Sequence, residues 1–192
     1  MASASNVIRA TIRQLNNKDV RLRRRAVRKL FELDDPAAID AFIPLLKEND
    51  EWFREKALMA IQRWASMKDL DLAEKLSKSK KPEERILACR IAPRVGKSSE
   101  SILRRMLDDE NNLVKQNAWK NILNINEDFI EDALENEDVG IKVLAIERIH
   151  LMNEINNEII KKILDDDSTR IRKKGINLLK SKPEIYSSGR FD

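Results

Sequence analysis

Leucines recur along the chain at near-constant intervals. They stand at Leu15, Leu46, Leu76, Leu107, Leu134 and Leu164, which are 31, 30, 31, 27 and 30 residues apart. Each leucine is followed after 11 or 12 residues by a small residue: Ala26, Ala57, Ala88, Ala118, Ala145 and Gly175. In most units apolar residues lie four positions before and four positions after the small residue, so they share one stripe of a helix. The pattern predicts one helical unit repeated six times, and therefore a solenoid.

The segment between each leucine and its small residue is polar and acidic, as in Leu46–Asp50 and Leu134–Asp138. Asp, Asn and Ser accept hydrogen bonds from the open amides of a helix start, so each unit is predicted to contain two antiparallel helices joined by a turn. First helices are predicted near Val7–Leu15, Ala37–Leu46, Lys68–Leu76, Ser99–Leu107, Glu127–Leu134 and Glu154–Leu164. Second helices are predicted near Val20–Leu33, Glu51–Ala65, Pro82–Ile91, Asn112–Leu123, Val139–Met152 and Thr169–Leu179.

These units resemble the HEAT repeat family. The resemblance rests on an apolar–basic–x–x–small step, which reads Phe53-Arg54-Glu-Lys-Ala57 and Val114-Lys115-Gln-Asn-Ala118. The unit of about 30 residues is shorter than the common HEAT unit of about 40–47 residues, and is similar to the short HEAT-like repeats of bilin lyases and many prokaryotic proteins. The resemblance implies an all-α fold, a right-handed α-solenoid of about six antiparallel helical hairpins. Such folds include scaffolds, nucleic-acid binders and a few enzymes, so the fold alone leaves the function open.

We expect a single repeat domain over residues 1–180, with repeats near 7–33, 36–66, 68–95, 98–124, 126–152 and 154–180. Residues 181–192 lose the helical period and are predicted to form a C-terminal tail. In this tail Ile185, Tyr186 and Phe191 are apolar anchors in a polar stretch. They are candidates for a docking motif, and the alternatives are a disordered end or a segment folded back on the last repeat.

A basic residue stands three positions before each small residue, at Arg23, Arg54, Arg85, Lys115, Lys142 and Arg172. The family resemblance implies that these cations pair with carboxylates of the turns, and Asp19, Asp50 and Asp138 are placed to join them. A structural role is favoured because the cation recurs in every unit, although a ligand-binding role remains the alternative.

Composition agrees with a helical protein. Of 192 residues only 4 are glycine, 36% are charged and 5% are aromatic, a balance that favours helix over sheet. No apolar run reaches the roughly 18–20 residues of a membrane span, and the first residues lack the features of a secretory signal. The single cysteine, Cys89, excludes an internal disulfide and is expected to be a buried, unreactive thiol. We therefore expect a cytoplasmic protein.

The resemblance also implies that second helices line the concave face. Outward positions there lie two before and two after the small residue: Arg24, Arg28, Glu55, Met59, Ile86, Arg90, Gln116, Lys120, Val143, Glu147, Lys173 and Asn177. This strip is basic in places, with apolar interruptions at Met59, Ile86 and Val143. A groove that follows a phosphate backbone is expected to be basic in nearly every unit. The patchy strip therefore favours a protein partner.

Charge is also uneven along the chain. Residues 20–31 carry six positive charges and residues 170–182 carry six more, whereas residues 127–138 hold seven negative charges. The arginines of the first run repel one another, which favours contact with an acidic protein surface or nucleic acid. The alternative is a solvated helix face on a terminal repeat. The predicted partner-binding residues are Arg21, Arg24, Arg25, Arg28, Met59, Arg90, Lys120 and Lys173.

Catalytic motifs are scarce. The only histidine is His150, so no zinc cluster is expected, and the chain has no glycine-rich phosphate loop. We expect no metal, cofactor or small-molecule substrate. The nearest enzymatic interpretation is an alkylpurine DNA glycosylase, which needs an acidic residue and stacking aromatics, and only Trp52 beside Glu51 and Glu55 fits.

The sequence therefore predicts a non-enzymatic adaptor that binds a protein partner through its concave face and its basic first repeat. The alternative is a nucleic-acid-binding protein, or an accessory subunit of a DNA- or RNA-processing complex.

Overall fold

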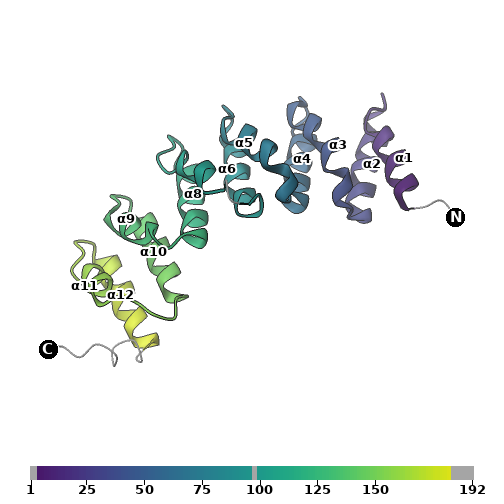
Figure 1. Ribbon diagram of the computed structural model, residues 1–192. Coiled ribbons are helices and arrows are strands. Elements are labelled where there is room, and N and C mark those ends of the chain that lie inside the picture. The colour runs from purple at the N-terminus through teal and green to yellow at the C-terminus, as the bar shows by residue number, and fades with distance from the viewer. Residues whose placement is uncertain (1–3, 97–98, 183–192) are drawn as a thin grey trace.

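The computed structural model of the protein describes residues 4–96 and 99–182, and Ile185, Tyr186 and Phe191 lie outside this range. The described residues form an all-α solenoid with twelve α-helices and no strand. Figure 1 shows the helices as hairpins stacked side by side in one curved row, with α1 and α2 at one end and α11 and α12 at the other. Within the described part, no helix is both long and apolar enough to cross a membrane.

Each hairpin pairs a first helical segment with a second helix, and in every hairpin except the third the second helix is the longer. The first segments are α1 (Ala4–Gln14), η1 (Pro36–Ala38) with α3 (Ile39–Phe42) and η2 (Ile43–Lys47), η3 (Met67–Asp69) with α5 (Leu70–Ser77), α7 (Ser99–Arg104), α9 (Phe129–Glu135) and α11 (Asn157–Leu164). The second helices are α2 (Val20–Leu33), α4 (Glu51–Trp64), α6 (Pro82–Ile91), α8 (Asn112–Ile125), α10 (Val139–His150) and α12 (Thr169–Ser181). A short 3-10 segment, η4 (Ala92–Arg94), follows α6.

The first segment of the second hairpin differs from its prediction. One helix was expected near Ala37–Leu46, but the structure has two 3-10 segments around the four-residue α3. Pro44 lies at the start of η2. Proline has no amide hydrogen to donate to the carbonyl four residues earlier, so α-helical bonding stops there.

The predicted stripe is the core of the solenoid. The small residues Ala57, Ala88, Ala118 and Ala145 are fully buried, and one apolar cluster runs from Ile8 to Leu178. At the last hairpin the helices approach so closely that a Cβ atom on Gly175 would lie 2.6 Å from Cγ2 of Ile163. A small side chain at this position therefore lets the two helices of a hairpin pack together.

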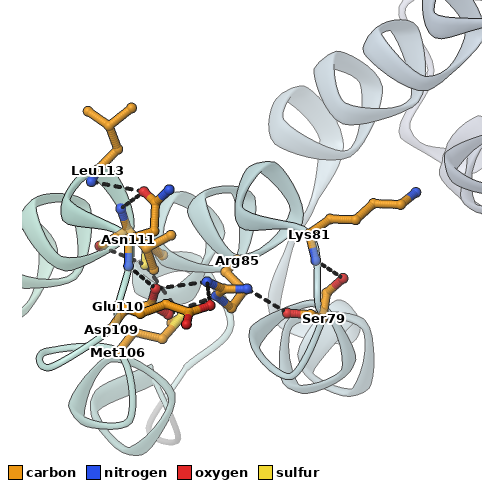
Figure 2. A network of polar contacts seen from close by, with 10 residues as sticks. Ser79, Lys81, Arg85, Met106, Asp109, Glu110, Asn111 and Leu113 are labelled. Atoms are coloured by element: carbon orange, nitrogen blue, oxygen red, sulfur yellow. Dashed lines mark hydrogen bonds and ion pairs between the residues drawn. The ribbon is translucent and has the colours of Figure 1, made fainter.

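Ion pairs join the first hairpin to the second, the third to the fourth and the fifth to the sixth. Arg23 pairs with Glu48 of the next turn. In Figure 2, Arg85 holds Asp109 through two hydrogen bonds of 2.7 and 2.8 Å and also donates to the carbonyl of Ser79.

Lys142 makes the third such pair, with its Nζ 2.6 Å from Asp166. Side chains in this pair and the Arg85 pair are 18% exposed or less, so these are largely desolvated pairs whose breaking would leave a buried charge.

Ion pairs occur at every second junction between hairpins because of the residue nine positions before each small residue. It is a carboxylate in the second, fourth and sixth hairpins, at Glu48, Asp109 and Asp166, and is uncharged in the others, at Asn17, Ser79 and Asn136. Where the next hairpin has no such carboxylate, the cation bonds backbone carbonyls of its own hairpin. Arg54 donates to the carbonyls of Glu48 and Asn49. Arg172 bonds its own turn in the same way.

The structural role predicted for the basic residues is thus confirmed for five of them, but the predicted carboxylates were wrong. Asp19, Asp50 and Asp138 each cap a second helix, accepting a hydrogen bond from the amide two residues later. A side chain directly before a helix can reach these open amides, so capping uses the carboxylates closest to the helix. Of the three, Asp50 also forms an ion pair, with Arg24.

The Arg85–Asp109 pair provides a direct test of the ion-pair argument. Replacing Arg85 with Met leaves a buried carboxylate without its partner and is expected to cost about 3–5 kcal/mol. The double variant Arg85→Met/Asp109→Leu should recover much of this loss, as urea unfolding followed by circular dichroism would measure. Arg54→Met is the matched control and should cost only about 1 kcal/mol, because Arg54 bonds carbonyls alone. Equal losses for Arg85→Met and Arg54→Met would contradict the alternation.

Acid should weaken the same interface. Burial raises the pKa of Asp109, but hydrogen bonds from Arg85 and from the Asn111 amide outweigh it, and the net pKa is below its usual value. A carboxyl group whose pKa is lowered by folding stabilises the fold at pH values above its unfolded pKa of about 3.9. This stabilisation is lost as the pH falls through the folded pKa. Thermal unfolding between pH 7 and pH 2 should therefore show a smaller pH-dependent loss for Asp109→Asn than for the natural chain. Parallel curves would contradict this assignment.

Candidate partner-binding surface

The exposed side of the second helices is the candidate site, and we call it the second-helix surface. It comprises the predicted outward positions Arg24, Arg28, Glu55, Met59, Ile86, Arg90, Gln116, Lys120, Glu147, Lys173 and Asn177, which are all exposed or half-buried. Met59 is 52% exposed and is one of several large apolar residues that remain exposed in the described part of the chain. The structure thus keeps one row of mixed charge and apolar groups along the solenoid.

Val143 does not belong to this surface, so its predicted exposure was wrong. It is only 7% exposed, one turn after Gly140 on the same side of α10. A Cβ atom on Gly140 would stand 3.4 Å from Nε2 of Gln116 on α8. Gly140 therefore lies close to a side chain of the preceding second helix, and Val143 is buried one turn later on the same side of α10.

Trp52 and two arginines form a cluster where the first two hairpins meet. The guanidinium carbons of Arg24 and Arg28 lie 5.2 and 5.7 Å from the centre of the Trp52 ring. Lys56 approaches the same ring, at 5.8 Å. Arg24 also bonds Asp50 at 2.8 Å, and this bond holds the pKa of that carboxyl below its usual range. Stacking on the ring orients cations that would otherwise repel one another.

The arginine run of α2 is divided between two sides of the helix. Arg24 and Arg28 face the second hairpin, as their contacts with Trp52 show. Arg25 instead lines a groove between α1 and α2, together with Lys29. Arg21 is exposed at the start of the helix. Arg24 and Arg28 therefore lie on a different side of the first hairpin from Arg25.

Farther along, Arg90 connects three second helices. Its Nη1 donates to Oε1 of Gln62 on α4 at 3.2 Å, and its Nε donates to Oδ1 of Asn117 on α8 at 3.3 Å. Lys120 and Lys173 are exposed on α8 and α12. The predicted binding residues therefore extend along most of the row but in separate groups.

Sequence reasoning missed the role of Asp34. This residue ends α2 in the left-handed conformation, with φ of 48°. Its carboxylate accepts hydrogen bonds from Arg63 at 2.6 Å and from Nε1 of Trp64 at 2.8 Å. These bonds hold its pKa below the usual value, with the Arg63 bond the larger cause. Only the fold shows this contact, because Asp34 and Trp64 are 30 positions apart.

Two of the tryptophans, Trp64 and Trp119, are core residues. Trp64 is 6% exposed and contacts Phe31 and Phe42. Trp119 is 5% exposed, lies against Phe129 of the next hairpin and donates to the carbonyl of Leu107 at 3.1 Å. Trp52 is half-buried.

Groups with catalytic or metal-binding chemistry are occupied or dispersed. Cys89 is fully buried, and burial raises the pKa of its thiol to about 12, so it is an inert core thiol at neutral pH. Oγ of Ser181 lies 3.4 Å from Nδ1 of His150. No group of three or more His, Cys, Asp or Glu residues in the described ranges is arranged to hold a metal ion.

Comparisons with known proteins identify the fold. No family model matches the chain, and no curated protein matches it significantly. A designed armadillo repeat protein in complex with the peptide (KR)4 is 18% identical, covers 91% of this chain and 98% of its own, and has a TM-score of 0.54. Computationally designed armadillo repeat proteins for modular peptide recognition are 19% identical, cover 91% and 99%, and have a TM-score of 0.55. The fold of this chain is thus that of the armadillo- and HEAT-like α-helical repeat solenoids.

Proposed function

We propose that this protein is a non-enzymatic scaffold that binds a protein partner along the second-helix surface. The observation that carries the proposal is the character of that surface, where exposed Met59 and half-buried Ile86 lie among charged groups of both signs. Protein interfaces combine apolar contacts with a polar surround in this way.

The position of the surface supports this proposal. Each second helix contacts the second helix of the next hairpin, from the pair α2 and α4 to the pair α10 and α12. These contacts are more extensive than those between the first segments of neighbouring hairpins. In a curved row the more closely packed layer is expected on the inner side. An extended segment of a partner lying there would meet several hairpins at once, which is how solenoids create long binding surfaces.

The order of charges argues against a phosphate-tracking groove. In chain order the charged members of the surface are Arg24, Arg28, Glu55, Arg90, Lys120, Glu147 and Lys173. Two carboxylates interrupt the row, and a nucleic-acid backbone would be repelled at both. A protein segment can instead match the alternation with charges of its own.

Two further observations support a non-enzymatic protein-binding role. Trp52, the one tryptophan considered for base stacking, is surrounded by Arg24, Arg28 and Lys56. Designed proteins of the same fold are described as peptide-bound or as peptide-recognition proteins. A cytoplasmic location remains our expectation from the lone buried cysteine.

The test compares partner capture by the natural chain and by Met59→Glu/Arg90→Glu. The partner is captured by affinity purification from the native host and counted by quantitative mass spectrometry. The variant should recover at least about tenfold less of it, since a charge in an apolar contact and a reversed charge each cost on the order of 1–3 kcal/mol. Leu151→Glu is the matched control, because Leu151 is 69% exposed and lies outside the second-helix surface. It should retain the partner.

A titration with a DNA duplex at about 50 and 200 mM salt tests the alternative, a nucleic-acid-binding protein. We expect weak binding at both. Tight binding that falls steeply with salt, and that is lost in the variant Arg24→Ala/Arg25→Ala/Arg28→Ala, would replace the scaffold proposal with a nucleic-acid-binding function.

A further inference from the structure

The first hairpin carries an open groove on the side facing away from the second hairpin. The groove lies between α1 and α2 and has a volume of about 530 Å³. Val7, Ala10, Leu22 and Ala26 supply its apolar part, and Arg25 and Lys29 supply two cations. No acidic residue is among the described residues that line it. We call it the end groove.

Exposure of Leu22 shows that this groove is an uncovered repeat interface. Leu22 lies four positions before the small residue, where Phe53, Val114, Ile141 and Ile171 are at most 1% exposed in later hairpins, whereas Leu22 is 40% exposed. Phe53 is covered from the preceding hairpin, since the guanidinium of Arg23 on α2 lies 4.3 Å from its ring centre. Leu22 is therefore the same stripe position without its covering helix.

The turn of the first hairpin also defines what a covering helix needs. The second, fourth and sixth hairpins carry a carboxylate nine positions before the small residue, which receives a cation from the hairpin before. The first hairpin has Asn17 there. A helix packed on the end groove therefore needs no cation to complete an ion pair with this turn.

Charge then identifies the chemistry of the occupant. Residues 4–33 carry nine basic and two acidic side chains, and Arg25 and Lys29 stand at the groove itself. Lys29 pairs with Glu32 at 3.0 Å, but both side chains are more than half exposed, and such pairs exchange readily. From these observations we propose that the end groove binds an acidic amphipathic helix of a partner protein. Its apolar stripe covers Val7 and Leu22, and its carboxylates pair with Arg25 and Lys29.

A second copy of this chain fits the groove poorly. Two first hairpins facing each other would bring their basic surfaces together. The opposite end of the row is also basic, because α12 carries five basic residues and no acidic one. Like charges at a contact cost several kcal/mol, so neither arrangement of two copies matches the groove as an acidic helix does.

The experiment uses the full chain and a stapled helical peptide of about four turns, with leucines on one stripe and glutamates on both flanks. A matched peptide carries lysine in place of every glutamate. Fluorescence anisotropy should detect binding of the glutamate peptide and at least tenfold weaker binding of the lysine peptide. Arg25→Glu/Lys29→Glu and, separately, Leu22→Glu should each weaken the glutamate peptide at least tenfold. These side chains are exposed, and circular dichroism checks that both variants stay folded.

Lys161→Glu on α11 is the matched control, since it reverses an exposed charge outside both the end groove and the second-helix surface, and it should bind the glutamate peptide unchanged. Absence of binding, equal binding of both peptides, or equal weakening by Lys161→Glu would overturn the proposal. A dimer of the natural chain in analytical ultracentrifugation that Leu22→Glu dissociates would also overturn it, because the occupant would then be a second copy. The inference goes beyond the proposed function. If the glutamate peptide does not bind but Met59→Glu/Arg90→Glu still reduces partner capture, only the end-groove proposal is refuted and the scaffold proposal stands.

Discussion

Burial of charge between hairpins is the constraint on which this solenoid depends. Arg85 and Asp109 are each about nine-tenths buried and hold one another through two hydrogen bonds. A buried charge without its partner is strongly unfavourable, so sliding these two hairpins past one another would leave both charges unpaired. A carboxylate stands nine positions before the small residue in every second hairpin only. The hairpins are therefore joined as three ion-paired couples. Between the second and third hairpins, apolar packing is joined by hydrogen bonds from cations to uncharged acceptors, such as that from Lys81 to the carbonyl of Leu46.

The same packing determines which residues remain available to a partner. Small residues bring the helices together until a Cβ atom no longer fits at Gly175, and Val143 on α10 is buried. What stays exposed is a row of mixed charges with Met59 among them, and the open flank of the first hairpin. Binding would therefore use the surfaces that stacking leaves exposed, without an enclosed pocket or a reactive group being required.

The basic first hairpin combines both surfaces in one helix. Arg24 and Arg28 stack on Trp52 and face along the row, whereas Arg25 and Lys29 face the end groove. A single run of basic residues can in this way serve two contacts, since successive residues of a helix point about 100° apart. The linear charge count describes neither contact by itself.

The sequence by itself determined the number of units, the place of nearly every helix and the buried stripe. These follow from local periodicity, because a helix that repeats every 3.6 residues must bury the positions that are apolar at that period. Tertiary structure decided the rest: that Glu48, Asp109 and Asp166 receive the cations while Asp50 caps a helix, that Asp34 bonds Trp64, and that Val143 is covered. Each of these depends on which atoms of neighbouring hairpins come within a few ångströms. That distance is set by the packing of whole helices and is not encoded in any short stretch of chain.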